Sequence, residues 1–160
     1  MTGPTSIRDE IKQQRPFQSK GQEATVALLR TTWMVRRRFE ALMARHDLTL
    51  QQFNVLRILR GAVEPLPTME VANRMIEQEP GITRLIGRLE SKGFVKRKRC
   101  GDDARRVLCE ITESGLSVLA GLDDDVLEMD NEVLGDLSED ELEQMISFLD
   151  RIRAHLPDEA

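Results

Sequence analysis

The sequence is poor in aromatic residues, cysteine and histidine. Its 160 residues include no tyrosine, one tryptophan, five phenylalanines, two cysteines and two histidines. A core must therefore be built mainly from Leu, Ile, Val and Met. Two histidines and two cysteines form no cluster spaced for a metal ion, and no phosphate-binding glycine loop or nucleophile motif is present. The composition argues against an enzyme and against a protein that depends on a metal or a cofactor.

Long hydrophobic runs are also missing. No stretch reaches the roughly 18 consecutive apolar residues of a membrane-spanning helix. The segment MTGPTSIRDEIKQQ at the start has no apolar core typical of a secretory signal. We therefore expect no association with a membrane and a cytoplasmic location, where both cysteines would be reduced thiols. The length fits one domain with interaction arms.

Charge is distributed unevenly along the chain. The formal net charge is −5, yet residues 84–106 hold nine basic and three acidic side chains, a net charge of +6. A basic segment in an acidic protein is typical of a surface that binds nucleic-acid phosphates. The alternative is a solvated, Lys- and Arg-rich hairpin that resists edge pairing. Residues 123–136 are strongly acidic and cannot face DNA.

The basic segment starts with a helix pattern and ends with a hairpin pattern. Apolar residues recur at spacings of three and four, namely Ile82, Leu85, Ile86 and Leu89. This periodicity predicts a helix over residues 80–92, which Gly93 would end in a left-handed conformation. Residues 94–100 and 107–111 predict two short strands joined by a polar loop. A helix followed by a basic hairpin is how a winged helix meets a DNA duplex.

The remaining patterns predict further helices. We expect a short helix within 5–14, a long one over 22–46, one that starts at a capping box in 49–52, a short one over 68–77, and others after 112, the last from a second capping box in 138–141. The helices over 68–77 and 80–92 would form a helix-turn-helix. The predicted fold is mainly α with a small β-hairpin wing, an α+β class.

The order of these motifs resembles the MarR (multiple antibiotic resistance regulator) family of winged helix-turn-helix transcription factors. The matching stretches are LTLQQFNVLRIL (48–59), MEVANRM (69–75), PGITRLIGRLESKGFVKR (80–97) and DDARRVLCEITESG (102–115). The wing carries the acid-x-Arg arrangement of the family as Asp103 and Arg105. Glu79 departs from the pattern, because relatives usually cap the recognition helix there with Ser or Thr; a carboxylate can also cap a helix.

The resemblance implies dimerisation helices at both ends of the chain. We expect an N-terminal arm with the first dimerisation helix over 1–47, the winged helix-turn-helix over 48–112, and C-terminal dimerisation helices over 113–160. The terminal helices also have more apolar positions than the winged helix can cover, so two copies would bury them against each other. A homodimer would bind a pseudo-palindromic site. The alternative is that these helices form the core of a monomer.

We expect ten residues of the helix and the wing to bind double-stranded DNA: Pro80, Gly81, Thr83, Arg84, Arg88, Lys96, Lys98, Asp103, Arg105 and Arg106. Thr83 and Arg84 lie in the first turns, where side chains meet base edges, and Arg84 and Arg88 can contact guanine or a phosphate. Arg105 can enter the minor groove, held by a hydrogen bond to Asp103. The other wing cations suit phosphates. A surface ion pair is the alternative for Arg88 and for Arg105, and a plain surface position is the alternative for Thr83.

The resemblance also implies a small aromatic or phenolic effector, bound between the dimer helices and the DNA-binding lobe. The candidate ligand residues are Trp33, Met34, His46 and Phe53. Each can equally be a core residue, and His46 can simply end its helix. The function that we infer is a sequence-specific DNA-binding transcriptional regulator, a repressor by resemblance, which binds as a homodimer and is released by such a ligand.

Two alternatives remain open. The first is a winged-helix adaptor that binds protein or RNA. The second is a redox-responsive regulator that uses Cys100 and Cys109. If Cys100 pairs with Val107 across the hairpin, Cys109 lies opposite Lys98, and the nearby cations would lower a thiol pKa. The cysteines can also be small fillers of the two strands.

The wing arginine gives the first prediction. Arg105→Ala should weaken operator binding by about 1–3 kcal/mol, because a groove contact is lost. Fluorescence anisotropy with a labelled duplex measures the change. An unaltered affinity would remove the wing from the mechanism.

Overall fold

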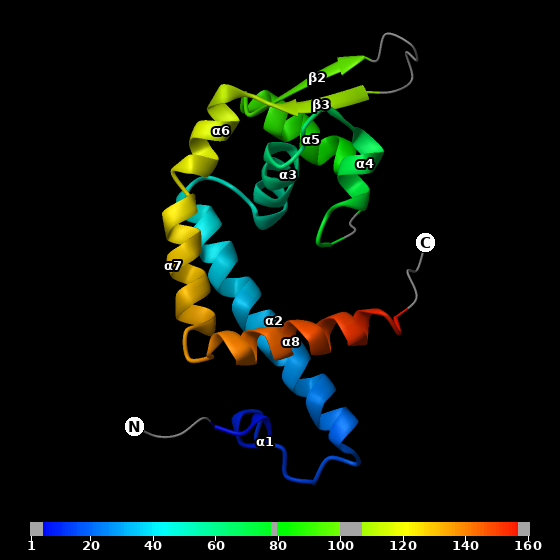
Figure 1. The fold of residues 1–160 in the computed structure, drawn as a ribbon, viewed down its shortest axis with the longest axis vertical. Helices are drawn as coiled ribbons and strands as arrows, with labels where there is room; N and C mark the ends of the chain where they lie inside the picture. The colour runs from blue at the N-terminus through cyan, green and yellow to red at the C-terminus, as the bar shows by residue number, and fades with distance from the viewer. Residues whose placement is uncertain (1–4, 78–79, 100–106, 157–160) are drawn as a thin grey trace. The chain divides into compact units, whose positions relative to one another are not determined.

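A computed structural model describes residues 5–77, 80–99 and 107–156 of the chain (Figure 1). In these residues the elements follow in the order α1 (Ile7–Glu10), α2 (Lys20–Arg45), α3 (Leu50–Arg60), β1 (Leu66–Pro67), α4 (Thr68–Asn73), α5 (Ile82–Ser91), β2 (Val95–Arg99), β3 (Val107–Ile111), α6 (Glu113–Ala120), α7 (Asp123–Leu134) and α8 (Glu139–Arg153). The mainly helical fold with a small β wing is thereby confirmed. None of the described helices has both the length and the apolar character needed to cross a lipid bilayer.

The chain divides into two compact units, residues 1–53 and 54–160. The first unit contains α1 and α2, close to the predicted helices. Ser19 starts α2 by accepting a hydrogen bond from the N–H of Gln22 at 3.1 Å. The guanidinium of Arg30 on α2 donates to Glu10 on α1 at 2.7 Å. This ion pair holds the short α1 against the long helix.

Both predicted capping boxes are present. The Oγ1 of Thr49 accepts from the N–H of Gln52 at 3.1 Å, and the Oε1 of Gln52 accepts from the N–H of Thr49 at 3.1 Å. Before α8, the N–H of Ser138 donates to Glu141 at 2.8 Å. Hydrogen bonds from Ser138 lower the pKa of the Glu141 carboxyl. Each box satisfies backbone N–H groups that a helix start leaves without partners.

The second unit contains the sheet, which is antiparallel with the order β1-β3-β2. Figure 1 shows the β2–β3 hairpin beside α5. The hairpin was predicted, but β1 was not, because Pro65 and Pro67 favour a turn. Pro67 has no N–H to donate, and it lies opposite Leu108 on a strand at the sheet edge. Edge strands tolerate proline, so this sequence signal for a break was misleading.

The core of the second unit is aliphatic, as the composition requires. Its most buried side chains come from helices and strands alike: Val55, Leu56, Leu59, Val71, Ile86, Leu89, Val95, Cys109, Leu119 and Leu122. Each of them is at most 4% exposed. The predicted apolar stripe of α5 therefore faces inward through Ile86 and Leu89. The opposite face of the helix is exposed to solvent.

The end of α5 follows the prediction for Gly93. This residue has a φ of 77°, in the left-handed region that favours glycine. Its N–H donates to the carbonyl of Glu90 at 2.9 Å, and the N–H of Phe94 donates to the carbonyl of Leu89 at 3.0 Å. These two bonds form a Schellman motif, which ends the helix and directs the chain into β2.

Thr112 joins this turn to α6. Its hydroxyl donates to the carbonyl of Gly93 at 2.6 Å and accepts from the N–H of Gly115 at 3.1 Å. A Cβ atom at Gly115 would lie 2.4 Å from the carbonyl oxygen of Phe94 and 2.7 Å from a side-chain carbon of Ile111. Only glycine allows this close approach of backbone to backbone.

We predict that Gly115→Ala destabilises the protein by about 1–3 kcal/mol, because the added methyl group overpacks the junction. Gly87→Ala in α5 is the matched control. No atom lies within 4 Å of its added Cβ, and alanine in a helix interior should stabilise by about 0.5–1 kcal/mol. Urea unfolding of both variants measures the two changes. Equal stability of the two variants would contradict the assigned close packing at Gly115.

Candidate nucleic-acid interface

The helix α5 begins two residues later than the sequence predicts. Gly81 occupies the N-cap position with a φ of 108°, and no side chain of a described residue caps the first turn. Pro80 and Gly81 are both exposed. Glu79, the expected cap, lies outside the described residues. A helix start without a side-chain cap leaves N–H groups that can bind an anion such as a phosphate.

The exposed face of α5 carries the predicted contact residues Thr83, Arg84 and Arg88. The opposite face is buried through Ile86 and Leu89, which are 0% exposed. Neither arginine forms an ion pair with another described residue. The alternative that Arg88 serves only in a surface ion pair therefore finds no support in the part of the chain that the structure describes.

The two predicted lysines of β2 differ from each other. Both Lys96 and Lys98 are exposed. Lys96 lies opposite Glu110 in the ladder, and its Nζ is 3.1 Å from the carboxylate of Glu110. Lys98 lies opposite Leu108 and pairs with no acid among the described residues. Lys98 is thus the more available of the two cations.

An ion pair between α5 and β2 was not predicted. The Nε of Arg97 donates to Glu90 at 2.7 Å, and a terminal nitrogen of Arg97 donates to the same carboxylate oxygen. These bonds lower the pKa of Glu90, and Glu90 in turn raises the pKa of Arg97. The two residues belong to different elements, so no helical or strand spacing in the sequence indicates their contact.

A buried asparagine holds the segment that follows α4. The side-chain oxygen of Asn54 on α3 accepts from the N–H of Ile76 at 2.9 Å, and Asn54 is 9% exposed. The helix α4 ends at Asn73, so the prediction of a helix over 68–77 is too long. The polar Asn54 inside the apolar stretch FNVL was the available signal, because a buried amide needs a partner.

Part of the predicted site lies outside the described residues. These positions are Asp103, Arg105, Arg106 and Cys100. Contact of the wing arginine with the minor groove stays a prediction.

The proposed ligand residues do not share one environment. Trp33 and Met34 are each 46% exposed on α2, whereas Phe53 is 4% exposed. His46 is the C-cap of α2, and its N–H donates to the carbonyl of Met43 at 3.0 Å. His46 thus ends its helix, as the alternative had it, and Phe53 is a core residue.

Cys109 does not fit the electrostatic argument for a reactive thiol. It is fully buried on β3, with its Sγ 3.6 Å from the hydroxyl of Thr68. Burial raises the pKa of the Cys109 thiol, so the predicted lowering is wrong for this residue. The assumed register is also wrong by one residue, because Cys109 lies opposite Arg97 rather than Lys98. For Cys109, the role of a strand filler is confirmed.

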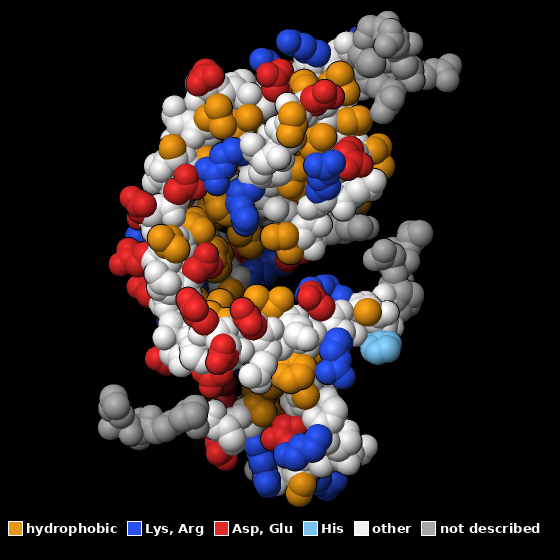
Figure 2. Space-filling model, in the orientation of Figure 1, with side chains coloured by type: hydrophobic (Ala, Val, Ile, Leu, Met, Phe, Trp, Pro, Cys, Tyr) orange, Lys and Arg blue, Asp and Glu red, His pale blue; other side chains and the backbone are white. Residues whose placement is uncertain are grey.

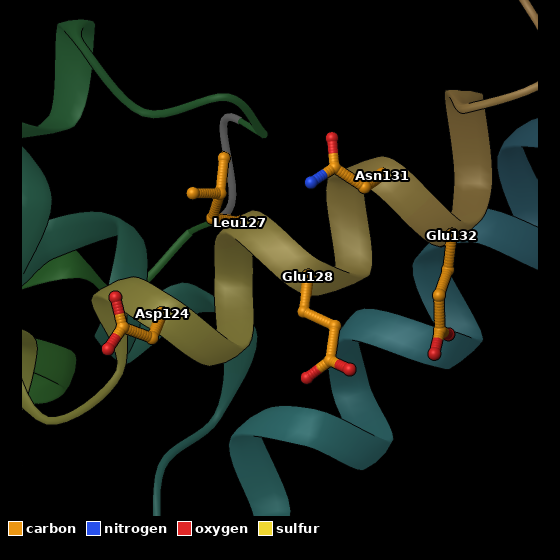
Figure 3. Close-up of a pocket in the computed structure, with 5 residues that line it drawn as sticks. All are labelled: Asp124, Leu127, Glu128, Asn131 and Glu132. Carbon is orange, nitrogen blue, oxygen red and sulfur yellow. The ribbon is translucent and has the colours of Figure 1, made fainter.

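Acidic side chains gather along α7 (Figure 2). An open hollow of about 460 Å³ lies on this helix and is lined by Asp124, Leu127, Glu128, Asn131 and Glu132 (Figure 3). Its carboxylates would repel phosphates.

A second cavity of about 670 Å³ adjoins α5 and includes Thr83 and Arg97 in its lining. No group of residues that could hold a metal ion occurs in the described ranges.

Comparison with known proteins supports a winged-helix regulator. Residues 37–122 match the family model described as transcriptional regulator SarA/Rot. The crystal structure of a MarR transcription factor from Planctomyces limnophilus is 35% identical, with a TM-score of 0.66 over 84% of this chain and 98% of that chain. This chain belongs to the MarR family. Members of this family are transcriptional regulators and not enzymes.

Two further relatives of this MarR-family protein are informative. The transcriptional regulator PecS of Dickeya dadantii is 24% identical over 131 residues, which cover 81% of this chain and 79% of PecS. Sco3205 of Streptomyces coelicolor, a MarR-family regulator solved in complex with DNA, has a TM-score of 0.77 at 18% identity. That match covers 91% of this chain and 95% of Sco3205 and shows the shared fold.

Burial of Cys109 gives a prediction about thiol chemistry. In a Cys100→Ser variant, Cys109 is the remaining thiol, and it should react slowly with Ellman's reagent at pH 8 while the protein is folded. A raised pKa keeps more of the thiol protonated at this pH than in a free cysteine, and burial limits access. In denaturant, one thiol per chain should react at once. Immediate reaction of the folded variant would return the redox alternative to consideration.

Proposed function

We propose that this protein is a sequence-specific repressor that binds a pseudo-palindromic operator as a homodimer. The observation that carries the proposal is the exposed face of α5, where Arg84 and Arg88 have no acidic partner among the described residues. The buried opposite face anchors the helix in the core. Cations on an anchored helix that have no acidic partner among the described residues are available to bases and phosphates.

The dimensions of α5 suit a major groove. The helix has 10 residues, so it is about 15 Å long, and an α-helix fits a groove about 12 Å wide. Thr83 and Arg84 lie in its first turn, where recognition helices contact base edges. Arg88 lies one turn further along, and Lys98 projects from the wing, where phosphates of the same duplex would be expected.

Exposed apolar side chains on the terminal helices support the homodimer. In the second unit they include Ile146 and Phe148, each 55% exposed, and Ile152, 45% exposed, all on α8. In the first unit, Leu29 of α2 is 66% exposed. Single exposed hydrophobic residues are ordinary, but several on one helix indicate a partner surface. A second copy would present a second recognition helix about 34 Å away, one turn of DNA.

Release by a small aromatic or phenolic effector completes the proposal. Trp33 offers a half-exposed indole ring, and the guanidinium groups of Arg30 and Arg37 lie 4.7 and 4.9 Å from its centre. A ring bearing a phenolate or a carboxylate could stack there and meet the nearby cations. Ligand binding would then act on the spacing of the recognition helices.

Selection of bound duplexes from a random pool tests this function. We expect enrichment of a palindromic sequence that binds two chains per duplex, with an affinity that falls steeply as salt rises. Arg84→Ala should weaken operator binding by about 1–3 kcal/mol through loss of a base contact. The control is Arg153→Ala on α8, since Arg153 already pairs with Asp150. This control should bind like the wild type.

The selection also distinguishes the alternatives. A pool without sequence preference would favour an adaptor for protein or RNA and would end the proposal. Enrichment of a site bound by one chain would retain sequence recognition and remove the homodimer. Repeating the selection with phenolic compounds present tests for release.

A further inference from the structure

The ion pair between Glu90 and Arg97 connects α5 to the β2–β3 hairpin. We call these two parts together, the helix and the wing proposed to contact DNA, the reading head. Glu90 lies in the last turn of α5, and Arg97 is the middle residue of β2. The guanidinium donates from two nitrogens to one carboxylate oxygen. The side chain of Glu90 is 37% exposed and that of Arg97 is 33% exposed. This is a close, charge-assisted contact of the kind that restricts both side chains.

The two residues point away from the cations assigned to DNA. Glu90 follows Thr83 by nearly two helical turns, so it lies on the side of α5 that carries Thr83, roughly 120° or more around the helix from Arg84 and Arg88. Along β2, side chains alternate between the two faces of the sheet, which separates Arg97 from Lys96 and Lys98. Arg97 lies opposite the buried Cys109 and shares its face of the sheet. Arg97 therefore lies on the same face of the sheet as the buried Cys109, with its side chain still partly exposed, while the two lysines lie on the other face.

Stability alone does not explain this pair. Partly exposed ion pairs contribute little to folding, because water screens the attraction and the side chains lose entropy. The chain between Ser91 and Val95 already turns by the hydrogen bonds of Gly93 and Phe94. Those bonds set the path of the backbone, whereas the ion pair joins the last turn of α5 to the middle of the wing strand.

We propose that Glu90 and Arg97 are positioning residues, whose ion pair fixes the wing against the recognition helix and withholds Arg97 from the DNA phosphates. This inference rests on the proposed DNA-binding function. By these two effects, the ion pair would favour the operator over other DNA sequences. A wing held at one angle lets both elements meet their grooves together, and a neutralised arginine adds no sequence-independent attraction.

The test compares salt dependence for the selected operator and for a random duplex of equal length. The slope of log affinity against log salt counts phosphate contacts, at about 0.9 per contact. Glu90→Gln/Arg97→Gln removes the pair without changing the net charge. We expect an unchanged slope, unchanged binding of the random duplex, and operator binding weaker by about fivefold, within the range for coupled side chains.

Three further variants separate positioning from charge. Glu90→Arg/Arg97→Glu restores a pair with reversed charges, and it should return operator affinity to within about threefold of the wild type. Glu90→Gln frees Arg97, so the slope should steepen by about one and the random duplex should bind more tightly. Lys98→Gln, on the outward face of the same strand, should make the slope shallower by about one for both duplexes.

The outcomes are distinct. A slope reduced in Glu90→Gln/Arg97→Gln, as in Lys98→Gln, would show that Arg97 contacts a phosphate and would overturn the inference while leaving the proposed function intact. Operator affinity unchanged in the same double variant would also overturn it. Failure of the wild type to bind any duplex would end the proposed function and this inference with it. Circular dichroism confirms that each variant is folded.

Discussion

The turn at the end of α5 is the constraint on which the reading head depends. Gly93 takes a left-handed conformation, and Thr112 holds its carbonyl from the far side of the wing. One hydroxyl thus connects the end of the recognition helix, the hairpin and the start of α6. Because Gly115 has no side chain, α6 can begin against the carbonyl of Phe94. Backbone hydrogen bonds and the Thr112 hydroxyl therefore set the path of the chain from α5 into the wing, and the ion pair of Glu90 and Arg97 is proposed to fix the wing on that path.

Charged side chains of opposite sign are separated within the second unit. The exposed cations of α5 and β2 belong to the surface proposed for DNA, whereas α7 carries a run of carboxylates. Within the reading head, acids are present but paired: Glu90 with Arg97, and Glu110 with Lys96. Such pairing reduces repulsion of phosphates and leaves Arg84, Arg88, Lys98 and Arg99 as the cations of α5 and β2 without a described acidic partner.

Much of the fold could be predicted because its signals are local. The stripe Ile82–Leu89, the glycine after it, and both capping boxes depend on residues within a few positions of one another. The strand β1, the register of the hairpin and the end of α4 could not be predicted this way. Each depends on a partner distant in sequence: Leu66 pairs with Cys109, and Asn54 binds the backbone of Ile76. The comparisons with known proteins confirm the predicted family, whereas the individual DNA contacts stay predictions.

The sequence by itself determined the order of helices and wing, the inward stripe of α5 and the family to which the chain belongs. These follow from periodicity, caps and motif order, which adjacent residues express without reference to the rest of the chain. Only the tertiary structure decided that Cys109 of β3 is buried and that Arg97 turns toward Glu90. A one-residue shift in strand register exchanges the two faces of a strand, and that register is set by packing between distant segments.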